Sequence, residues 1–192
     1  MKEKRERSLA SPSKPQGSAC LPAGQAGLPV RQGLASNSQS HNPEKARAYA
    51  FLLLKFRLRS GNELKAKLKQ KGFSEELAGA TVSFLKNKEL IDDRVFARGW
   101  ILSRLKRRFG LRRIEQELLQ KGVDKEIIKN SLSQVKEDYN ESQIVSQLAR
   151  QRFSKLKSIE PLKAKARVYA YLIRRGFASD IAGEVLNKLS NG

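Results

Sequence analysis

The sequence has little of the residue types that most enzymes and metal sites use. Its 192 residues include one cysteine, Cys20, and one histidine, His41. A single cysteine excludes an internal disulfide and any pair of cysteines that would hold zinc. Glycine-rich phosphate loops and nucleophile elbows are also missing. We therefore expect a protein that is not an enzyme and needs no cofactor or metal; chemistry by carboxylates alone is the remaining enzymatic hypothesis.

Long hydrophobic runs are missing as well. The longest uninterrupted apolar run covers seven residues, 48–54, whereas a membrane-spanning helix needs about 20. The basic start MKEKRER has no apolar core behind it, so it does not resemble a secretory signal. We expect a cytoplasmic protein with no membrane partner.

Acidic residues are scarce relative to basic ones. The chain carries 39 lysines and arginines against 19 aspartates and glutamates, which gives a net charge of +20 and a pI near 10.4. Such a charge favours nucleic acid or another polyanion as the partner. An anionic membrane surface attracts the same charge, so charge alone does not identify the partner.

Aromatic residues are missing from the first 43 positions, which hold five of the six prolines and seven serines. Such a segment buries too little apolar surface to offset the entropy lost on ordering. We predict a disordered basic tail over residues 1–43, and both an interaction arm and a mis-assigned start site fit this composition.

From Pro43 onward the apolar residues recur at helical spacing, and three segments repeat one pattern. They read KGFSEELAGATVSFL, KGVDKEIIKNSLSQV and RGFASDIAGEVLNKL, and their glycines are Gly72, Gly122 and Gly176. Leu64, Ile114 and Val168 occupy equivalent positions in this pattern, which predicts that they share one buried face. Glycine ends a helix in the left-handed conformation without a side-chain penalty. This pattern predicts an all-α fold of three tandem three-helix repeats, over 44–91, 92–138 and 139–192, forming an elongated, curved array. The first helices are expected at about 44–59, 92–109 and 141–156.

Short polar residues before the helical stretches are candidate helix caps. Ser60, Ser74, Asp124 and Ser179 precede helix-like segments and fit this role. Asp92 and Asp93 could be read as a metal pair, but neighbours on a helix point about 100° apart. We interpret Asp92 as a cap and Asp93 as an acid favoured by the helix dipole.

Aromatic pairs offer a second ambiguous signal. Trp100 lies one turn after Phe96, and the two could form a platform on which an unpaired base stacks. Burial in the core is the more usual role for such a pair. Tyr169 and Tyr171 pose the same question, and only one of them can share the face of Val168 fully.

A basic cluster in RLKRRFGLRRIEQELLQKGV is the leading candidate for a binding surface. It surrounds the corner between two expected helices, and further cations occur in all three repeats. A solvated helix surface is the alternative reading, but few acids lie nearby to neutralise the cluster, which favours contact with phosphates or an acidic protein. The candidate contact residues are Arg104, Lys106, Arg107, Arg108, Arg112, Arg113, Lys67, Lys71, Lys121 and Arg150.

Three stretches of the chain resemble the RecX family of bacterial recombination regulators. They read LLLKFRLRSGNELKAKLKQKGF, LIDDRVFARGW and RFGLRRIEQELLQKGV. The resemblance covers about residues 46–138 well and the third repeat more loosely, since that repeat lacks a close match to LIDD. It implies tandem three-helix repeats, in agreement with the repeat pattern.

The resemblance also implies a function. RecX proteins are expected to bind the RecA–DNA filament along its groove and to inhibit or disassemble it. Such a protein would modulate homologous recombination, DNA repair and the SOS response. The expected partners are the RecA filament and single-stranded DNA, with double-stranded DNA as a further candidate, and the chain is expected to be a monomer. Two hypotheses compete with this one: a stand-alone helical-repeat DNA-binding protein, and a carboxylate enzyme that uses Asp92 and Asp93.

Overall fold

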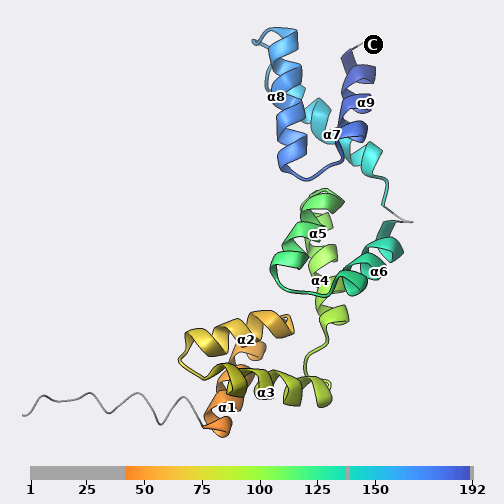
Figure 1. The fold of residues 1–192 in the computed structure, drawn as a ribbon. Coiled ribbons are helices and arrows are strands. Elements are labelled where there is room, and N and C mark those ends of the chain that lie inside the picture. Colours follow the sequence, from red (N-terminus) through yellow and green to blue (C-terminus); the bar gives the residue numbers. More distant parts are fainter. Residues whose placement is uncertain (1–41, 137–138, 191–192) are drawn as a thin grey trace, which may run out of the picture. The chain divides into compact units, whose positions relative to one another are not determined.

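The computed structural model describes residues 42–136 and 139–190. The predicted disordered tail over 1–43 lies outside these residues, apart from its last two positions. The described part contains nine α-helices and no strand (Figure 1), so the predicted all-α fold is confirmed. The helices are α1 (Pro43–Phe56), α2 (Gly61–Gln70), α3 (Glu75–Asn87), α4 (Asp93–Lys106), α5 (Leu111–Gln120), α6 (Lys125–Lys136), α7 (Glu141–Phe153), α8 (Pro161–Arg174) and α9 (Ser179–Ser190).

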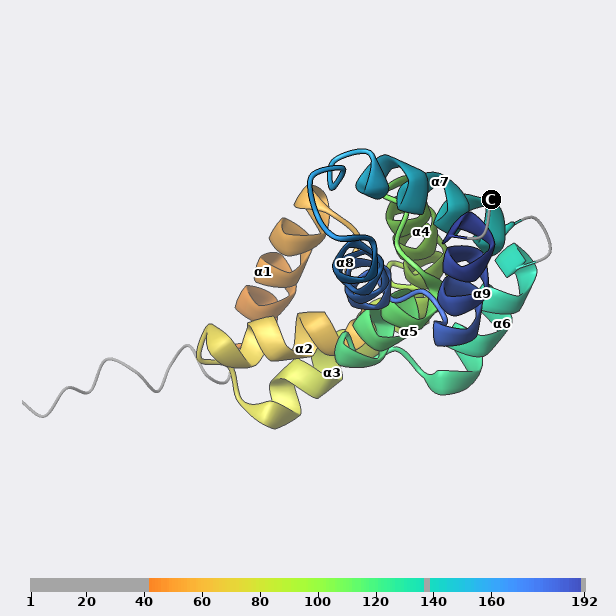
Figure 2. The same cartoon turned by 90° about the horizontal axis from the view of Figure 1, so that it is seen from above.

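The helices form three repeats of three, and each repeat has its own hydrophobic core. Figure 2 shows α1 beside α2 and α3, which it contacts. The middle helices contribute equivalent core residues, because Leu64, Ile114 and Val168 are all fully buried. These three positions were predicted to share one buried face. The cores themselves are separate clusters, so each repeat folds around its own apolar residues.

The glycine turns between the second and third helices take the predicted conformation. Gly72, Gly122 and Gly176 have φ angles of 101°, 67° and 85°. Each turn is closed by a hydrogen bond from the next backbone N–H to a carbonyl five residues earlier, such as Val123 N to Leu118 O. The predicted helix stops are therefore confirmed.

Three of the four further cap predictions are confirmed. The hydroxyls of Ser60 and Ser74 accept hydrogen bonds from backbone N–H groups three residues on, and Asp124 accepts one from the N–H of residue 126. The prediction for Ser179 is wrong, because this residue is already the first residue of α9. Ala178 precedes it, and its carbonyl accepts the first helical hydrogen bond, from Ala182 N.

The first helix of each repeat ends earlier than the pattern predicted. Helix α1 ends at Phe56 because Arg57 is extended, with φ −166° and ψ 159°. Helix α4 ends at Lys106, and Arg108 then takes a left-handed φ of 56°. No glycine or proline stands at either end, so the sequence held no signal for these stops. Along the described residues no helix is both long enough and apolar enough to cross a membrane.

Candidate nucleic-acid interface

The corner between α4 and α5 presents three consecutive basic side chains to solvent. Lys106 ends α4, and Arg107 and Arg108 follow it; all three are exposed. The left-handed Arg108 closes the helix, because its N–H donates to Leu105 O at 2.8 Å and the next N–H donates to Arg104 O at 3.2 Å. This closure resembles a glycine stop, but a charged residue occupies the left-handed position. The corner therefore holds three cations that point away from the core of the repeat.

The backbone of this corner is held from the third repeat. Arg175 Nη1 donates to the carbonyls of Arg107 and Arg108 at 2.8 and 2.9 Å. Arg175 O accepts from Gly110 N at 2.9 Å, and the Tyr139 hydroxyl donates to the Phe109 carbonyl at 3.2 Å. Because the backbone is already fixed, it loses little further conformational entropy when the exposed side chains bind a ligand.

Three other predicted contact residues are engaged inside the protein. The guanidinium of Arg104 pairs with Glu117 at 2.5 Å, and its side chain is only 19% exposed. Arg113 also pairs with Glu117, at 3.1 Å, and donates to Arg174 O. Lys121 pairs with Glu63 across the first two repeats at 2.6 Å. Their role as ligand contacts stays a prediction, but their charges are already partly neutralised.

Glu117 is the centre of this internal network. Its carboxylate accepts hydrogen bonds from Trp100 Nε1 at 3.1 Å and from both Arg104 and Arg113. Burial raises the pKa of Glu117, but the hydrogen bonds from Arg113 and Arg104 outweigh that effect and leave the pKa below its ordinary value. A lowered pKa means that the folded state stabilises the charged carboxylate. The network is thus structural.

The four remaining candidates lie on other parts of the chain. Arg112 is exposed in the first turn of α5, close to the corner, and Arg150 is exposed on α7. On α2, Lys67 Nζ donates to a glutamine side chain at 2.8 Å, and Lys71 lies 5.6 Å from a tyrosine ring centroid. Of these four residues, only Arg112 lies beside the corner formed by Lys106, Arg107 and Arg108. The ten candidates therefore do not form one cluster.

Each repeat contains one acid-free stretch that includes most of its first helix. Residues 45–62, 94–114 and 142–159 hold no aspartate or glutamate. Exposed cations lie at or just after the end of each of these helices: Lys55 and Arg57; Lys106, Arg107 and Arg108; Arg152, Lys155 and Lys157. The same corner is therefore basic in all three repeats. The sequence predicted cations in all three repeats, but it did not predict that they share this position at the end of the first helix.

The aromatic pair of α4 belongs to the protein interior. Phe96 is buried, and its ring stacks on Trp100 with centroids 5.9 Å apart. The Trp100 ring is partly buried, and Arg104 and Lys121 each lie 4.1 Å from its centroid. The core assignment of this pair is confirmed. In the third repeat Tyr171 packs on the core while Tyr169 is exposed, as the spacing predicted.

The two adjacent aspartates have structural partners. Asp92 caps α4 by accepting from Arg94 N at 2.7 Å. Asp93 pairs with Lys86 at 2.8 Å and accepts from Gly61 N at 2.9 Å, so it also links the first two repeats. The described residues contain no group of three or more histidine, cysteine, aspartate or glutamate side chains placed to hold a metal ion.

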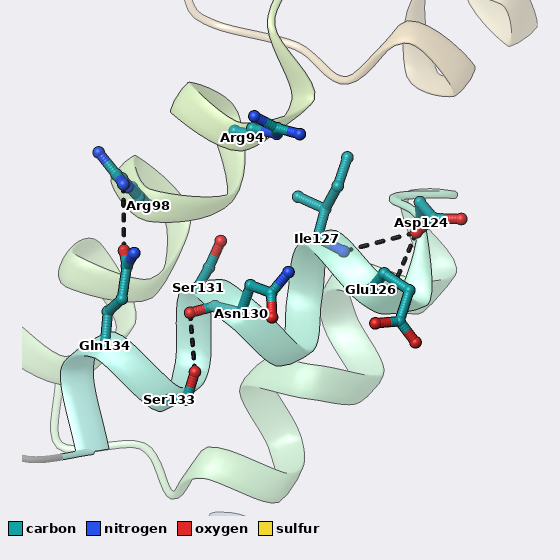
Figure 3. Close-up of a pocket in the computed structure, with 9 residues that line it drawn as sticks. All are labelled: Arg94, Arg98, Asp124, Glu126, Ile127, Asn130, Ser131, Ser133 and Gln134. Atoms are coloured by element: carbon teal, nitrogen blue, oxygen red, sulfur yellow. Dashed lines mark hydrogen bonds between the residues drawn. The ribbon is translucent and has the colours of Figure 1, made fainter.

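A polar pocket of about 520 Å³ lies between α4 and α6 (Figure 3). Arg94 and Arg98 line one side, and Arg98 donates to Gln134 at 3.1 Å. Asp124 and Glu126 line another part of it, and Asp124 is occupied with capping α6. Charges of both signs in one pocket do not favour a polyanion, so this pocket is a poorer candidate than the basic corners.

Comparison with known proteins identifies the family. Three family models match this chain: the first three-helix domain of RecX over residues 46–85, the second over 92–132 and the third over 140–186. The chain belongs to the RecX family. The regulatory protein RecX of Mycobacterium sp. (strain KMS) is 34% identical over 155 residues, which cover 78% of this chain and 84% of that protein.

Other RecX proteins agree in sequence and in fold. The RecX of Caldanaerobacter subterraneus subsp. tengcongensis is 31% identical over 144 residues, covering 75% of this chain and 70% of that protein. The crystal structure of RecX from Lactobacillus salivarius matches with a TM-score of 0.67 at 20% identity, over 78% of this chain and 97% of that one. The third repeat, for which the motif resemblance was loose, is matched like the other two.

Proposed function

We propose that this RecX-family protein regulates the RecA recombinase by binding the RecA–DNA filament in its groove and inhibiting or disassembling it. By doing so it modulates homologous recombination, DNA repair and the SOS response. The observation that carries the proposal is the basic corner that ends the first helix in each of the three repeats. No acidic residue lies within the three stretches that hold these corners.

Repetition of the corner supports a repetitive ligand. A nucleic-acid strand carries one negative charge per nucleotide, so it can meet successive basic corners with successive phosphates. The separate cores keep each corner attached to a folded unit of its own. The mixed-charge pocket of the second repeat would suit a small polar ligand better than a strand.

Membership of a regulatory family supports a binding role over catalysis. The relatives are named regulatory proteins, and Asp92 and Asp93 are occupied by capping and by Lys86. We further propose that the chain acts as a monomer in the cytoplasm, and that the exposed cations of the corners contact the DNA of the filament.

Binding to RecA filaments tests the proposal against its alternative. The protein would be titrated into RecA filaments on single-stranded DNA and, separately, into the same DNA without RecA. Preferential binding to the filament is the expected result. Equal affinity for both would support the alternative, a stand-alone helical-repeat DNA-binding protein, which the basic corners alone also favour.

A further inference from the structure

Phe56, at the end of α1, is the most exposed of the large hydrophobic side chains that the structure describes, at 75%. Helix α1 turns Ala46 and Ala50 into the core, and a different face of the helix carries Leu52 and Phe56 one turn apart. Leu52 is half exposed. A single exposed leucine is ordinary. An exposed phenylalanine one turn beyond it extends the apolar surface, and this surface does not pack against the rest of the fold.

Cations surround this ring. Lys55 and Arg57 are its neighbours in the chain, and both are exposed. Residues 45–71 hold nine lysines and arginines against one acid, Glu63. That carboxylate already accepts from Arg57 at 3.1 Å and from Lys121 at 2.6 Å. Two cations share one anion, so the surroundings of Phe56 keep a positive charge.

The internal repeat indicates which ligand meets the ring. Ser60 and Gly110 hold the same position, as the residues that cap the middle helices of the first two repeats. Phe56 precedes Ser60 by as many residues as Lys106 precedes Gly110, so the two positions are equivalent. Lys106 is the first cation of the corner in the second repeat. A ligand that lies across equivalent corners therefore meets charge at Lys106 and an aromatic face at Phe56.

We propose that Phe56 stacks on an unpaired base of single-stranded nucleic acid, while Lys55 contacts an adjoining phosphate. Aromatic side chains beside cations are the usual means of holding a single strand without reading its sequence. Duplex DNA does not fit this site, because its base faces are covered by stacking on their neighbours. The proposal deepens the proposed function and rests on it for the source of the strand, but the test below uses an oligonucleotide alone.

The test compares Phe56→Ala and Phe56→Tyr with the wild type on a fluorescently labelled oligothymidylate. Stacking on aromatic side chains contributes about 1–3 kcal/mol per base, so Phe56→Ala should weaken binding about 5- to 150-fold. Phe56→Tyr should bind like the wild type because it keeps the ring. The dependence of binding on salt should not change in either variant, since no charge is removed.

Two controls separate stacking from general loss of apolar surface. Leu162→Ala removes a side chain that is equally exposed, at 74%, in the third repeat, and should leave binding unchanged. On an oligonucleotide of the same length that carries abasic sugars throughout, wild type and Phe56→Ala should bind equally. Thermal unfolding should show the same midpoint for all variants, because the replaced side chains lie in solvent.

Either of two results would overturn the proposal. One is an affinity of Phe56→Ala for oligothymidylate equal to that of the wild type. If that variant then binds RecA filaments less well than the wild type, the ring contacts protein and not a base. The other is an equal loss of affinity for the abasic strand, which would show that the ring does not touch a base. A protein with no effect on RecA would still show the stacking result, so the two proposals fail separately.

Discussion

Removal of the three exposed cations at the corner of the second repeat should flatten the salt dependence of DNA binding. The variant carries Lys106→Ala, Arg107→Ala and Arg108→Ala. Each phosphate contact on a single strand contributes about 0.7 to the slope of log affinity against log salt. If each side chain makes one contact, the slope should fall by about 2, and binding should be measured on single-stranded DNA over a range of salt concentrations.

The structure predicts that this variant folds normally. The three side chains are exposed, and among the described residues they make no ion pair. Their backbone contacts to Arg175 run through carbonyls, which alanine keeps. Arg104→Ala is the matched control: it removes a cation of the same cluster that is committed to Glu117, so it should lower stability and change the slope little.

An unchanged slope in the triple variant would show that these three side chains do not contact phosphates. The corner would then be an ordinary solvated surface, and the cations of the other two corners would carry the contact. A slope that falls as much in Arg104→Ala as in the triple variant would also contradict the prediction, because partly buried, ion-paired side chains would then be as available to phosphates as exposed ones.

Four further changes test the internal architecture. Glu117→Gln removes the anionic partner of Arg104 and should destabilise the fold by about 1–2 kcal/mol, measured by thermal unfolding with Trp100 fluorescence. Because the pKa of Glu117 is lowered in the folded protein, the charged carboxylate stabilises the fold above its unfolded pKa of about 4.5, and this stabilisation disappears as the pH falls through the folded pKa. Acid should therefore narrow the difference in stability between the wild type and Glu117→Gln. Gly122→Ala should destabilise the fold more than Gly72→Ala. Both glycines have positive φ, but of these two only Gly122 has a neighbour that a Cβ would meet, the Asn62 side chain at 2.3 Å. Equal losses of stability in the two variants would show that this contact does not matter. Arg108→Gly should raise stability by up to about 1 kcal/mol, because glycine adopts the left-handed φ of 56° without strain. The same change should weaken DNA binding. Chemical denaturation and a binding titration measure the two effects separately.

The sequence predicted the helices and the glycine turns because both depend on local chemistry. Helical spacing of apolar residues identified the buried faces of Leu64, Ile114 and Val168. Glycine supplied the left-handed turns at Gly72 and Gly122. Where no such residue was present, the prediction failed, and the first helices proved to end three residues earlier than expected.

The candidate site was only partly predictable, because charge does not reveal exposure. Arg104 and Arg108 lie four residues apart in one cluster, yet Arg104 is paired with Glu117 and Arg108 is exposed. That difference depends on a carboxylate 13 residues away along the chain and on the packing of α4 against α5. The contact of Arg175 with the corner joins residues more than 60 positions apart, which no local pattern contains.

The rate of ATP hydrolysis by RecA on single-stranded DNA is the measurement that decides whether this protein inhibits RecA filaments. The rate would be followed while the wild-type protein is added, and again with the Lys106, Arg107 and Arg108 triple-alanine variant. We expect the wild type to lower the rate in proportion to the amount bound, and the triple variant to need a higher concentration for the same effect. A rate that stays constant while the wild type binds the filament would contradict a role in inhibiting or disassembling it.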